Sequence, residues 1–360
     1  MDLFCGAGGL SAGLVKAGWR VIGAADWWVP AVRSYALNFS HPVARLDLAS
    51  ADVRSITGAF DLPPSPLDLV VGGPPCQGFS VQRIGPDADS RNDLVLAFAE
   101  LVVGLRPRMF LMENVPGLLG SRGRATATRF ERVLHLAGYD LDKTLVNAAD
   151  YGVPQNRRRV FFIGWLAGQL PAFRFPSPTS SPTARRTVAE SLGALPSPPA
   201  DFSASPTDPL HRRTKLSPVN LVRLGRIPPG GGFEDLPVEL RVAAHKRGAA
   251  TIGHRYVYGR LDPTKPAATI TARFDSFTRG KFGHPFEDRN ITLREGARLQ
   301  TFDDSFRFEG TQEEIAALIG NAVPPLLAEV IGRALLSHTA TDVNLPTEPR
   351  PRQLPLLEAP

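Results

Sequence analysis

Cys76 is the side chain in this sequence best suited to act as a nucleophile. It follows Gly72, Gly73 and two prolines, and it precedes Gln77 and Gly78. The prolines fix the backbone before the cysteine, and the glycines argue against a packed core, the usual place of a lone cysteine. We therefore expect the thiol to be exposed in a cleft, where neighbouring cations favour the nucleophilic thiolate.

Two other polar groups could assist such a thiolate. Arg157, Arg158 and Arg159 could supply the cations, although a run of charges is more often a solvated surface. Glu113 ends a predicted strand and could donate a proton to a substrate. Together, these groups could support a nucleophilic cysteine.

A glycine-rich segment at the start of the chain could bind a cofactor. Residues 2–9 (DLFCGAGG) open a predicted helix, whose first N–H groups can face a ligand. Asp26 lies about twenty positions further on, where a ribose-binding carboxylate is expected. Each feature alone could be a tight turn or a helix cap. Together they favour an adenosine-containing cofactor without choosing among several.

The elements that must position these groups alternate between strands and helices. Strand-like runs lie at residues 20–25, 43–46, 67–72, 108–112 and 159–163, and helical patterns at 10–17, 31–38, 93–105 and 125–137. This alternation predicts an α/β fold with a mostly parallel, doubly wound sheet. Residues 2–9, Asp26, Asp47, Cys76 and Glu113 all come at the ends of strands, so we expect them on one edge of the sheet.

The composition changes after this first part. Residues 171–237 are dense in Pro, Ser and Gly, and basic residues accumulate up to Lys281. Such a stretch predicts an irregular, loop-rich module. A helical pattern returns at 315–336, and the polar, Pro-rich end of the chain predicts disorder. We therefore divide the chain into a catalytic domain (1–170, with a return at 291–337), a second module at 171–290, and a disordered tail at 338–360.

Bulk properties restrict the class of protein only loosely. The net charge of +6 and the pI of about 9.6 permit a polyanionic partner. Two cysteines in separate segments do not form a disulfide framework, and a reducing compartment is expected. There is no secretion signal and no long apolar run, so we expect a cytoplasmic protein with no membrane span.

Six segments of the chain resemble the cytosine-C5 DNA methyltransferases, and the resemblance covers nearly all of residues 1–336. In chain order they read DLFCGAGGLS, GGPPCQGFS, ENVPG, QNRRRVFFIG, LREGARLQTFDD and IGNAVPPLLAEVIG. The pair PPCQGFS and ENVPG is the most specific. The family carries its target-recognition domain between the fourth and fifth segments, where the composition changes. The family also has several strand residues before its first motif, so we expect a truncated first strand here or a start upstream of Met1.

The resemblance implies a Rossmann-like, doubly wound S-adenosylmethionine-dependent methyltransferase fold with a smaller, irregular target-recognition domain. It also implies S-adenosyl-L-methionine as the cofactor and no metal. The residues implied in its pocket are Phe4, Gly6, Gly8, Gly9, Asp26, Trp27, Asp47, Pro75, Leu94 and Asn321.

For catalysis, the resemblance implies that Cys76 adds to C6 of a cytosine flipped out of the double helix. Glu113 would bond the N3/N4 edge of that base, and Arg157 and Arg159 would contact the base and steady a catalytic loop at 77–90. Double-stranded DNA is the expected substrate, bound by a monomer, with a cognate restriction endonuclease as a further partner. The expected DNA contacts are Gln77, Ser80, Arg83, Arg91, Arg273, Ser276 and Thr278.

Two alternatives remain open at this point. One branch of the family methylates cytosine in tRNA, but the long basic stretch from about 170 to 288 favours DNA. A catalytically inactive DNA-binding relative is the other alternative, and the presence of Cys76, Glu113, Arg157 and Arg159 argues against it. The loop at 273–278, after a predicted strand at 269–271, is expected to read bases, although a structural arginine there is equally compatible with the sequence.

Overall fold

The computed structural model describes residues 1–62, 66–75, 93–193, 195–243, 245 and 257–339. One seven-stranded sheet in the order β3-β2-β1-β4-β5-β7-β6 organises these residues. Strands β1 to β5 are mutually parallel, whereas β7 runs antiparallel to both β5 and β6. The strands are β1 (Asp2–Leu3), β2 (Ala24–Asp26), β3 (Val43–Arg45), β4 (Leu69–Gly72), β5 (Met109–Asn114), β6 (Tyr139–Asn147) and β7 (Arg158–Leu166).

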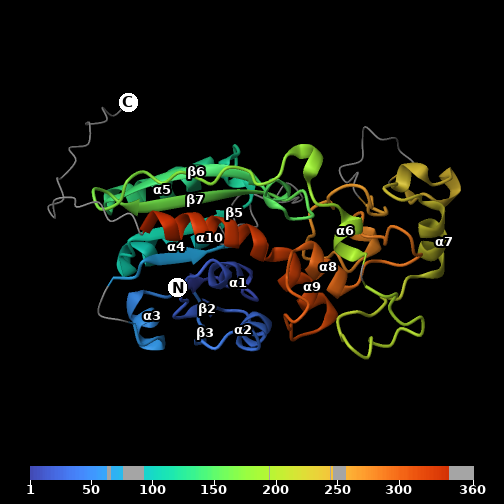
Figure 1. The fold of residues 1–360 in the computed structure, drawn as a ribbon, viewed down its shortest axis with the longest axis horizontal. Helices are drawn as coiled ribbons and strands as arrows, with labels where there is room; N and C mark the ends of the chain where they lie inside the picture. Colours follow the sequence, from blue (N-terminus) through green and yellow to red (C-terminus); the bar gives the residue numbers. More distant parts are fainter. Residues whose placement is uncertain (63–65, 76–92, 194, 244, 246–256, 340–360) are drawn as a thin grey trace.

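Helices cover both faces of this sheet, as Figure 1 shows. Alternate side chains of β5 enter two different cores: Phe110 and Met112 pack on one face, Met109 and Leu111 on the other. The first core includes residues of α3 (Val53–Ala59), α4 (Asp93–Leu105) and α5 (Arg124–Leu136), and the second includes residues of α1 (Gly9–Lys16) and α10 (Pro325–Thr339). This period of two explains why a central strand reads as a continuous apolar run. The predicted doubly wound α/β fold is confirmed.

The C-terminal helical pattern is two helices rather than one. The sequence predicts a single helix at 315–336, but α9 (Gln312–Asn321) ends before Pro324, and α10 begins at Pro325 and continues to Thr339. The cause is proline, which lacks an N–H and excludes helical backbone at the residue before it. The stretch from 312 to 339 is apolar and long enough to cross a membrane, yet 67% of its most apolar window is buried. Leu327, Ile331 and Leu335 belong to the second core, as expected for the core helix of a globular domain.

Three other details differ from the prediction. Strand β6 and helix α3 were not predicted, because their sequences are polar and only partly buried. The segment 269–271 is not a regular strand; the nearest pairing is one isolated bridge between Gln155 and Ala267. Residues 338 and 339, predicted as the start of a disordered tail, are the last residues of α10, and the rest of that predicted tail lies outside the described residues.

The stretch 171–290, which we call the recognition region, contains little regular structure. Its helices are α6 (Val188–Leu192), α7 (Pro218–Arg226) and short 3-10 turns. A small core of its own includes Leu224, Phe233 and Phe277. Buried Arg260 donates hydrogen bonds to the carbonyls of Leu224, Ile227, His284 and Glu287. In Figure 1 α7 lies at the right-hand end, with α8 (Leu293–Leu299) and α9 between it and the sheet.

A buried polar chain lies beneath the first turn of the structure. The Ser11 hydroxyl donates to Oδ2 of Asp2 at 2.6 Å, and the Tyr35 hydroxyl donates to Ser11 at 2.6 Å. Tyr35 also lies 2.6 Å from Nε2 of His41. Burial raises the pKa of Asp2 from 3.8 to about 7, and the bond from Ser11 opposes this rise. The carboxyl group of Asp2 is therefore costly to ionise in the folded protein.

This burial predicts a pH-dependent stability that Asp2→Asn removes. Because the folded pKa lies above the ordinary value, the favourable contribution of protonated Asp2 is complete at low pH and is lost as the pH rises through about 7. Relative to the variant, wild type should lose roughly 1 kcal/mol of unfolding free energy per pH unit where the change is steepest. Urea unfolding between pH 4 and 8 measures this difference.

A second variant tests the cause. Ser11→Ala removes the hydrogen bond that holds the pKa of Asp2 down, so it should move the pH-dependent window upward. Parallel pH profiles for wild type and Asp2→Asn would show that Asp2 does not titrate in this range.

Candidate active site

The carboxyl ends of five parallel strands bring most of the predicted site residues together. Residues 4–9 follow β1, Asp26 ends β2, Asp47 follows β3 and Pro75 follows β4. Glu113 is the last residue but one of β5, next to Asn114. In open parallel sheets this edge is where ligands bind. The predicted convergence on one edge is therefore found among the described residues.

The glycine-rich turn leaves open space at one position only. Gly6 has φ +54, and a Cβ placed there would meet no atom within 4 Å. A Cβ on Gly8, which has φ +101, would lie 2.4 Å from the Phe39 ring, and one on Gly9 would lie 2.3 Å from the carbonyl oxygen of Val323. Gly8 and Gly9 thus permit close packing, whereas Gly6 gives a ligand access to the backbone.

Asp26 fixes this turn and faces the same space. Its carboxylate accepts the N–H of Gly6 and the N–H of Trp28, each at 2.9 Å. Burial raises the pKa of Asp26, and these backbone hydrogen bonds oppose the rise. The neighbouring Trp27 is 59% exposed, which is unusual for so large an apolar ring. An accepting carboxylate beside an uncovered indole suits a ribose and an adenine.

The remaining predicted cofactor residues lie around this turn. Asp47 is exposed and accepts the N–H of Ala49 at 3.1 Å. Phe4, with φ 59, packs against the first core, and Leu94 is partly buried in the first turn of α4. Asn321 is the exposed last residue of α9, and the contact between Gly9 and Val323 holds the following loop against the start of α1. The open turn, Asp26 and Trp27 therefore fit an adenosine-bearing cofactor.

Glu113 and Arg159 form the charged centre of the site. Strand β7 runs antiparallel to β5, so its first residues lie beside the last residues of β5, with Glu113 opposite Phe161. Nε of Arg159 lies 2.9 Å from Oε1 of Glu113, and both side chains are largely buried. The ion pair holds the carboxylate in place while Oε2 faces the end of β4, 3.6 Å from where a Cβ of Gly73 would lie.

The residues before Cys76 are tied to the same strand end. The Asn114 side chain donates to the carbonyl of Pro74 at 3.0 Å, and its oxygen accepts the N–H of Val115. Cys76 itself lies outside the described residues, as do the predicted DNA contacts Gln77, Ser80, Arg83 and Arg91. The other cysteine, Cys5, is buried near Ala24 and Tyr35, and burial raises the pKa of its thiol well above the ordinary value. Cys5 is therefore a poor nucleophile.

Arg157 has different surroundings from those expected for a residue that contacts a base. Its side chain is 1% exposed, and Nη1 donates to the carbonyls of Ile270 and Gly320 at 3.2 and 3.0 Å. Burial, together with the charge of Arg159, lowers the pKa of Arg157 well below its ordinary value. Gln155 and Gln300 are fully buried beside it and hydrogen-bonded to each other at 2.9 Å. No role was expected for these two glutamines, although both stand within the quoted motifs.

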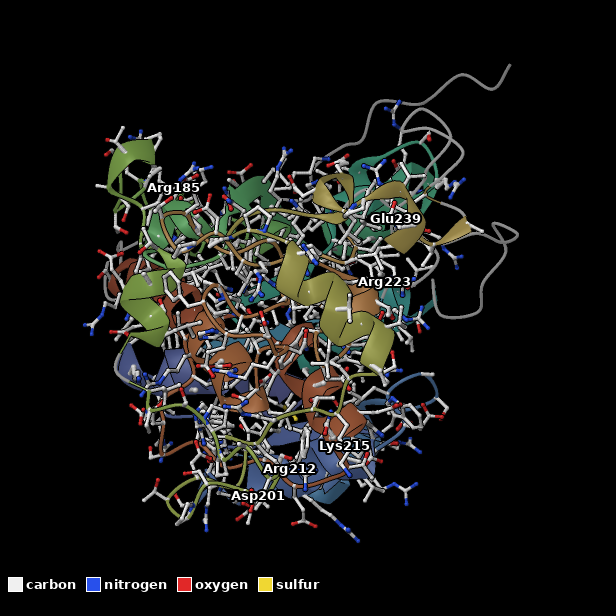
Figure 2. The ribbon with its side chains drawn as sticks, turned by 90° about the vertical axis from the view of Figure 1, so that its right-hand side faces the viewer. Arg185, Asp201, Arg212, Lys215, Arg223 and Glu239 are labelled. Atoms are coloured by element: carbon white, nitrogen blue, oxygen red, sulfur yellow. The ribbon has the colours of Figure 1, made fainter. Side chains whose placement is uncertain are left out.

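The predicted base-reading loop is braced by ion pairs. Arg273 lies 3.1 Å from Asp275 and 3.1 Å from Glu313 of α9, and Ser276 shares a hydrogen bond with Thr278. Figure 2 shows the end of the molecule that carries α7, where the labelled Arg212, Lys215 and Arg223 lie among the acidic Asp201 and Glu239. The positive charge of the recognition region is therefore interrupted on this face.

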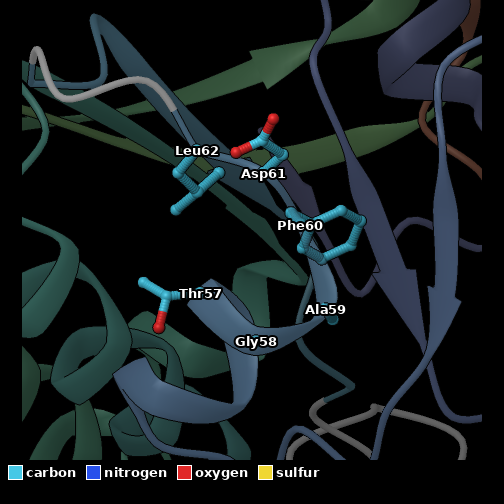
Figure 3. A pocket seen from close by; sticks show the side chains of 6 residues that line it. All are labelled: Thr57, Gly58, Ala59, Phe60, Asp61 and Leu62. Atoms are coloured by element: carbon cyan, nitrogen blue, oxygen red, sulfur yellow. The ribbon is translucent and has the colours of Figure 1, made fainter.

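A hollow elsewhere on the surface is unrelated to this site. Figure 3 shows it lined by residues 57–62, including Phe60, Asp61 and Leu62. These residues end α3 and lead toward the amino end of β4, on the sheet edge opposite the glycine-rich turn. No predicted site residue lines the hollow.

Known proteins resemble this chain over nearly its whole length. The model of the C-5 cytosine-specific DNA methylase family matches residues 1–337. The Type II methylase M.HgiDII of Herpetosiphon aurantiacus is 32% identical over 343 residues, covering 93% of this chain and 94% of the relative. The Type II methyltransferase M.XorII of Xanthomonas oryzae pv. oryzae is 33% identical and covers 97% of this chain and 87% of its own.

Solved structures agree with this relationship. A structure described as a DNA modification methyltransferase encoded within an E. coli prophage superposes with a TM-score of 0.68 at 30% identity, covering 94% of this chain and 98% of that one. Dnmt2 of S. pombe has a TM-score of 0.56 at 16% identity and covers 93% of this chain and 97% of its own, which shows the shared fold alone. The chain therefore belongs to the C-5 cytosine-specific DNA methylase family, enzymes that use S-adenosyl-L-methionine to methylate carbon 5 of cytosine in DNA.

Proposed function

We propose that this enzyme methylates a specific cytosine of double-stranded DNA through a covalent bond between Cys76 and C6 of a flipped-out base. The cysteine thiolate adds to C6, and the electron pair of the C5–C6 double bond is displaced into the ring, which makes C5 nucleophilic. Transfer of the methyl group to C5 would leave S-adenosylhomocysteine; a base such as water then takes the C5 proton, and elimination of the thiolate restores the aromatic ring. A base stacked in a duplex could not reach such a site.

The arrangement of Glu113 supports this mechanism most directly. Its carboxyl group is held by Arg159 at the strand end next to the Pro74–Pro75 segment that leads to Cys76. A carboxylate in this position can take up a proton as the base binds, bond N3 of a cytosine, and transfer that proton there as charge accumulates in the ring. The buried Cys5 thiol offers no competing nucleophile, because burial raises its pKa.

The cofactor would bind at the glycine-rich turn. S-adenosyl-L-methionine supplies a methyl group, bound to a sulfonium, that the activated C5 accepts. Gly6 gives it access to the backbone, Asp26 accepts hydrogen bonds from the ribose, and Trp27 covers the adenine. Asp47 and Asn321 would complete this pocket from the end of β3 and the end of α9.

The covalent step predicts an adduct that can be trapped. DNA with 5-fluorocytosine at the target cannot lose fluorine as a cation, so wild type with S-adenosyl-L-methionine should accumulate an enzyme–DNA species that survives denaturing gels. Cys76→Ser should form none, because a serine hydroxyl is far less nucleophilic than a thiolate. Glu113→Gln should form it roughly 100-fold more slowly or worse, the usual contribution of general acid catalysis.

Cys5→Ser is the matched control for that experiment. Its thiol is buried in the cofactor turn, so trapping should stay close to wild type. An adduct that persists in Cys76→Ser but disappears in Cys5→Ser would refute the assignment of the nucleophile.

The cofactor site predicts losses of affinity with different pH dependence. Asp47→Ala should weaken S-adenosylhomocysteine binding by roughly 0.5–1.5 kcal/mol, the net contribution of a typical hydrogen bond, since Asp47 is exposed. Because the pKa of Asp26 is raised, its ionised form, which accepts hydrogen bonds, is lost as the pH falls. The wild-type affinity should therefore decrease toward acidic pH, and Asp26→Asn should flatten the pH dependence of the affinity. Calorimetry measures both. Unchanged affinity in both variants would place the cofactor elsewhere.

The recognition region would bind DNA and choose the sequence. We propose that residues 273–278 read bases and that exposed Arg279, which follows them, contacts phosphate. Because the relatives are Type II methylases, we also propose that a cognate restriction endonuclease shares the recognised sequence.

These two kinds of DNA contact predict different behaviour in substituted enzymes. Thr278→Val should change the methylated sequence, with a discrimination change of about 1–3 kcal/mol at one base pair. Arg279→Ala should weaken binding to all sequences and reduce the salt dependence by about one phosphate contact. Bisulfite sequencing and anisotropy titrations against salt separate these outcomes. If Arg279→Ala instead changed the methylated sequence and Thr278→Val weakened binding to all sequences, Arg279 would be the base contact and Thr278 the phosphate contact.

A further inference from the structure

A chain of buried amide side chains connects the recognition region to the end of α9. Gln155 accepts the N–H of Ile270 at 2.9 Å and donates to Oε1 of Gln300 at 2.9 Å. Gln300 in turn donates to the carbonyl of Ile319 at 2.6 Å. Both glutamine side chains are fully buried. The connection therefore runs from Ile270 to Ile319 without passing through solvent.

Arg157 makes a second connection parallel to the first. Its Nη1 donates to the carbonyl of Ile270 and to the carbonyl of Gly320. The N–H and the carbonyl of Ile270 are thus bonded to Gln155 and Arg157, both of which precede β7. Arg157 also reaches the end of α9 directly, and Gln155 reaches it through Gln300.

The two joined segments are also in direct contact. A Cβ on Gly320 would lie 2.2 Å from the main-chain carbonyl of Thr271, so even a methyl group does not fit between them. Ile270 lies three residues before Arg273, and Gly320 immediately precedes Asn321. A displacement of either segment would leave several buried donors and acceptors without partners, which is energetically unfavourable. The two segments are therefore expected to move as one.

We propose that Gln155, Arg157 and Gln300 are positioning residues that couple DNA recognition to cofactor binding. This inference rests on the proposed roles of residues 273–278 and of Asn321. A shift of the recognition loop on DNA would be carried by Ile270, and the side-chain connections would transmit it to the end of α9. By thermodynamic linkage, the cofactor strengthens DNA binding by the same factor by which DNA strengthens cofactor binding.

Binding equilibria test this coupling without turnover. Calorimetry would measure the affinity for S-adenosylhomocysteine with and without a duplex that carries the site found by bisulfite sequencing. In wild type the duplex should tighten binding by about 5- to 150-fold, the usual range for coupled sites. In Gln300→Met, which keeps the side-chain length but not the hydrogen bonds, this factor should fall severalfold, because only the connection through Arg157 and the direct contact remain. Gln169→Met, at an exposed glutamine, is the matched control and should keep the wild-type factor.

Arg157 offers a second test. Its Nη1 makes both of its bonds, and the ammonium group of Arg157→Lys ends one bond nearer the main chain, so the lysine variant keeps a buried charged donor that reaches the two carbonyls less well, whereas Arg157→Met keeps no donor at all. The lysine variant should retain part of the coupling factor, and the methionine variant should retain less. This contrast remains informative if Gln300→Met fails to fold. A merely structural role would lower the unfolding free energy of the variants and leave the factor unchanged.

The outcome is independent of the proposed chemistry. A wild-type factor close to one, or an equal factor in wild type, Gln300→Met and Arg157→Met, would overturn the coupling while adduct trapping at Cys76 still succeeds. If trapping fails while the two methionine variants still lower the coupling factor relative to wild type, the covalent mechanism is overturned and the coupling is kept.

Discussion

The reversal of strand β7 brings to the active edge side chains that the parallel strands could not place there. Five parallel strands alone would bring only strand-following loops to their carboxyl ends. Because β7 runs antiparallel beside β5, its amino end reaches the same edge and delivers Arg159 to Glu113. The residues just before β7, including Gln155 and Arg157, are thereby placed between the sheet and the recognition region. A parallel β7 would put all of these side chains on the opposite edge.

Burial of charge at this edge serves positioning more than stability. A buried ion pair contributes little net stability, since the cost of removing both charges from water offsets their attraction. Glu113 and Arg159 nevertheless hold each other at a fixed place near Gly73, and Asp26 is held by two backbone N–H groups. Fixed dipoles and charges of this kind need no reorganisation when a substrate arrives.

The sequence predicted the parts of this molecule that obey local rules. The central strands, helix α4 and the convergence of Asp26, Asp47 and Glu113 follow from apolar periodicity and from the positions of polar residues at strand ends. The surroundings of Arg157 could not be predicted, because its partners Ile270 and Gly320 are more than one hundred residues away and offer only main-chain carbonyls, which carry no sequence signal. Strand β6 was missed for a related reason: an edge strand with exposed polar residues lacks the apolar pattern.

The recognition region illustrates a different way to build a stable module from loops. Arg260 bonds to four carbonyls in two separate segments, and Arg289 makes paired contacts with Glu295 at 2.8 Å. In this region guanidinium groups bond to main-chain carbonyls that the hydrogen-bond ladder of a sheet would otherwise satisfy, since each group can bond to several carbonyls at once. The framework is thus independent of the residues exposed on it. Such a separation makes the module evolvable: mutation can diversify the exposed loops while the arginine framework stays constant.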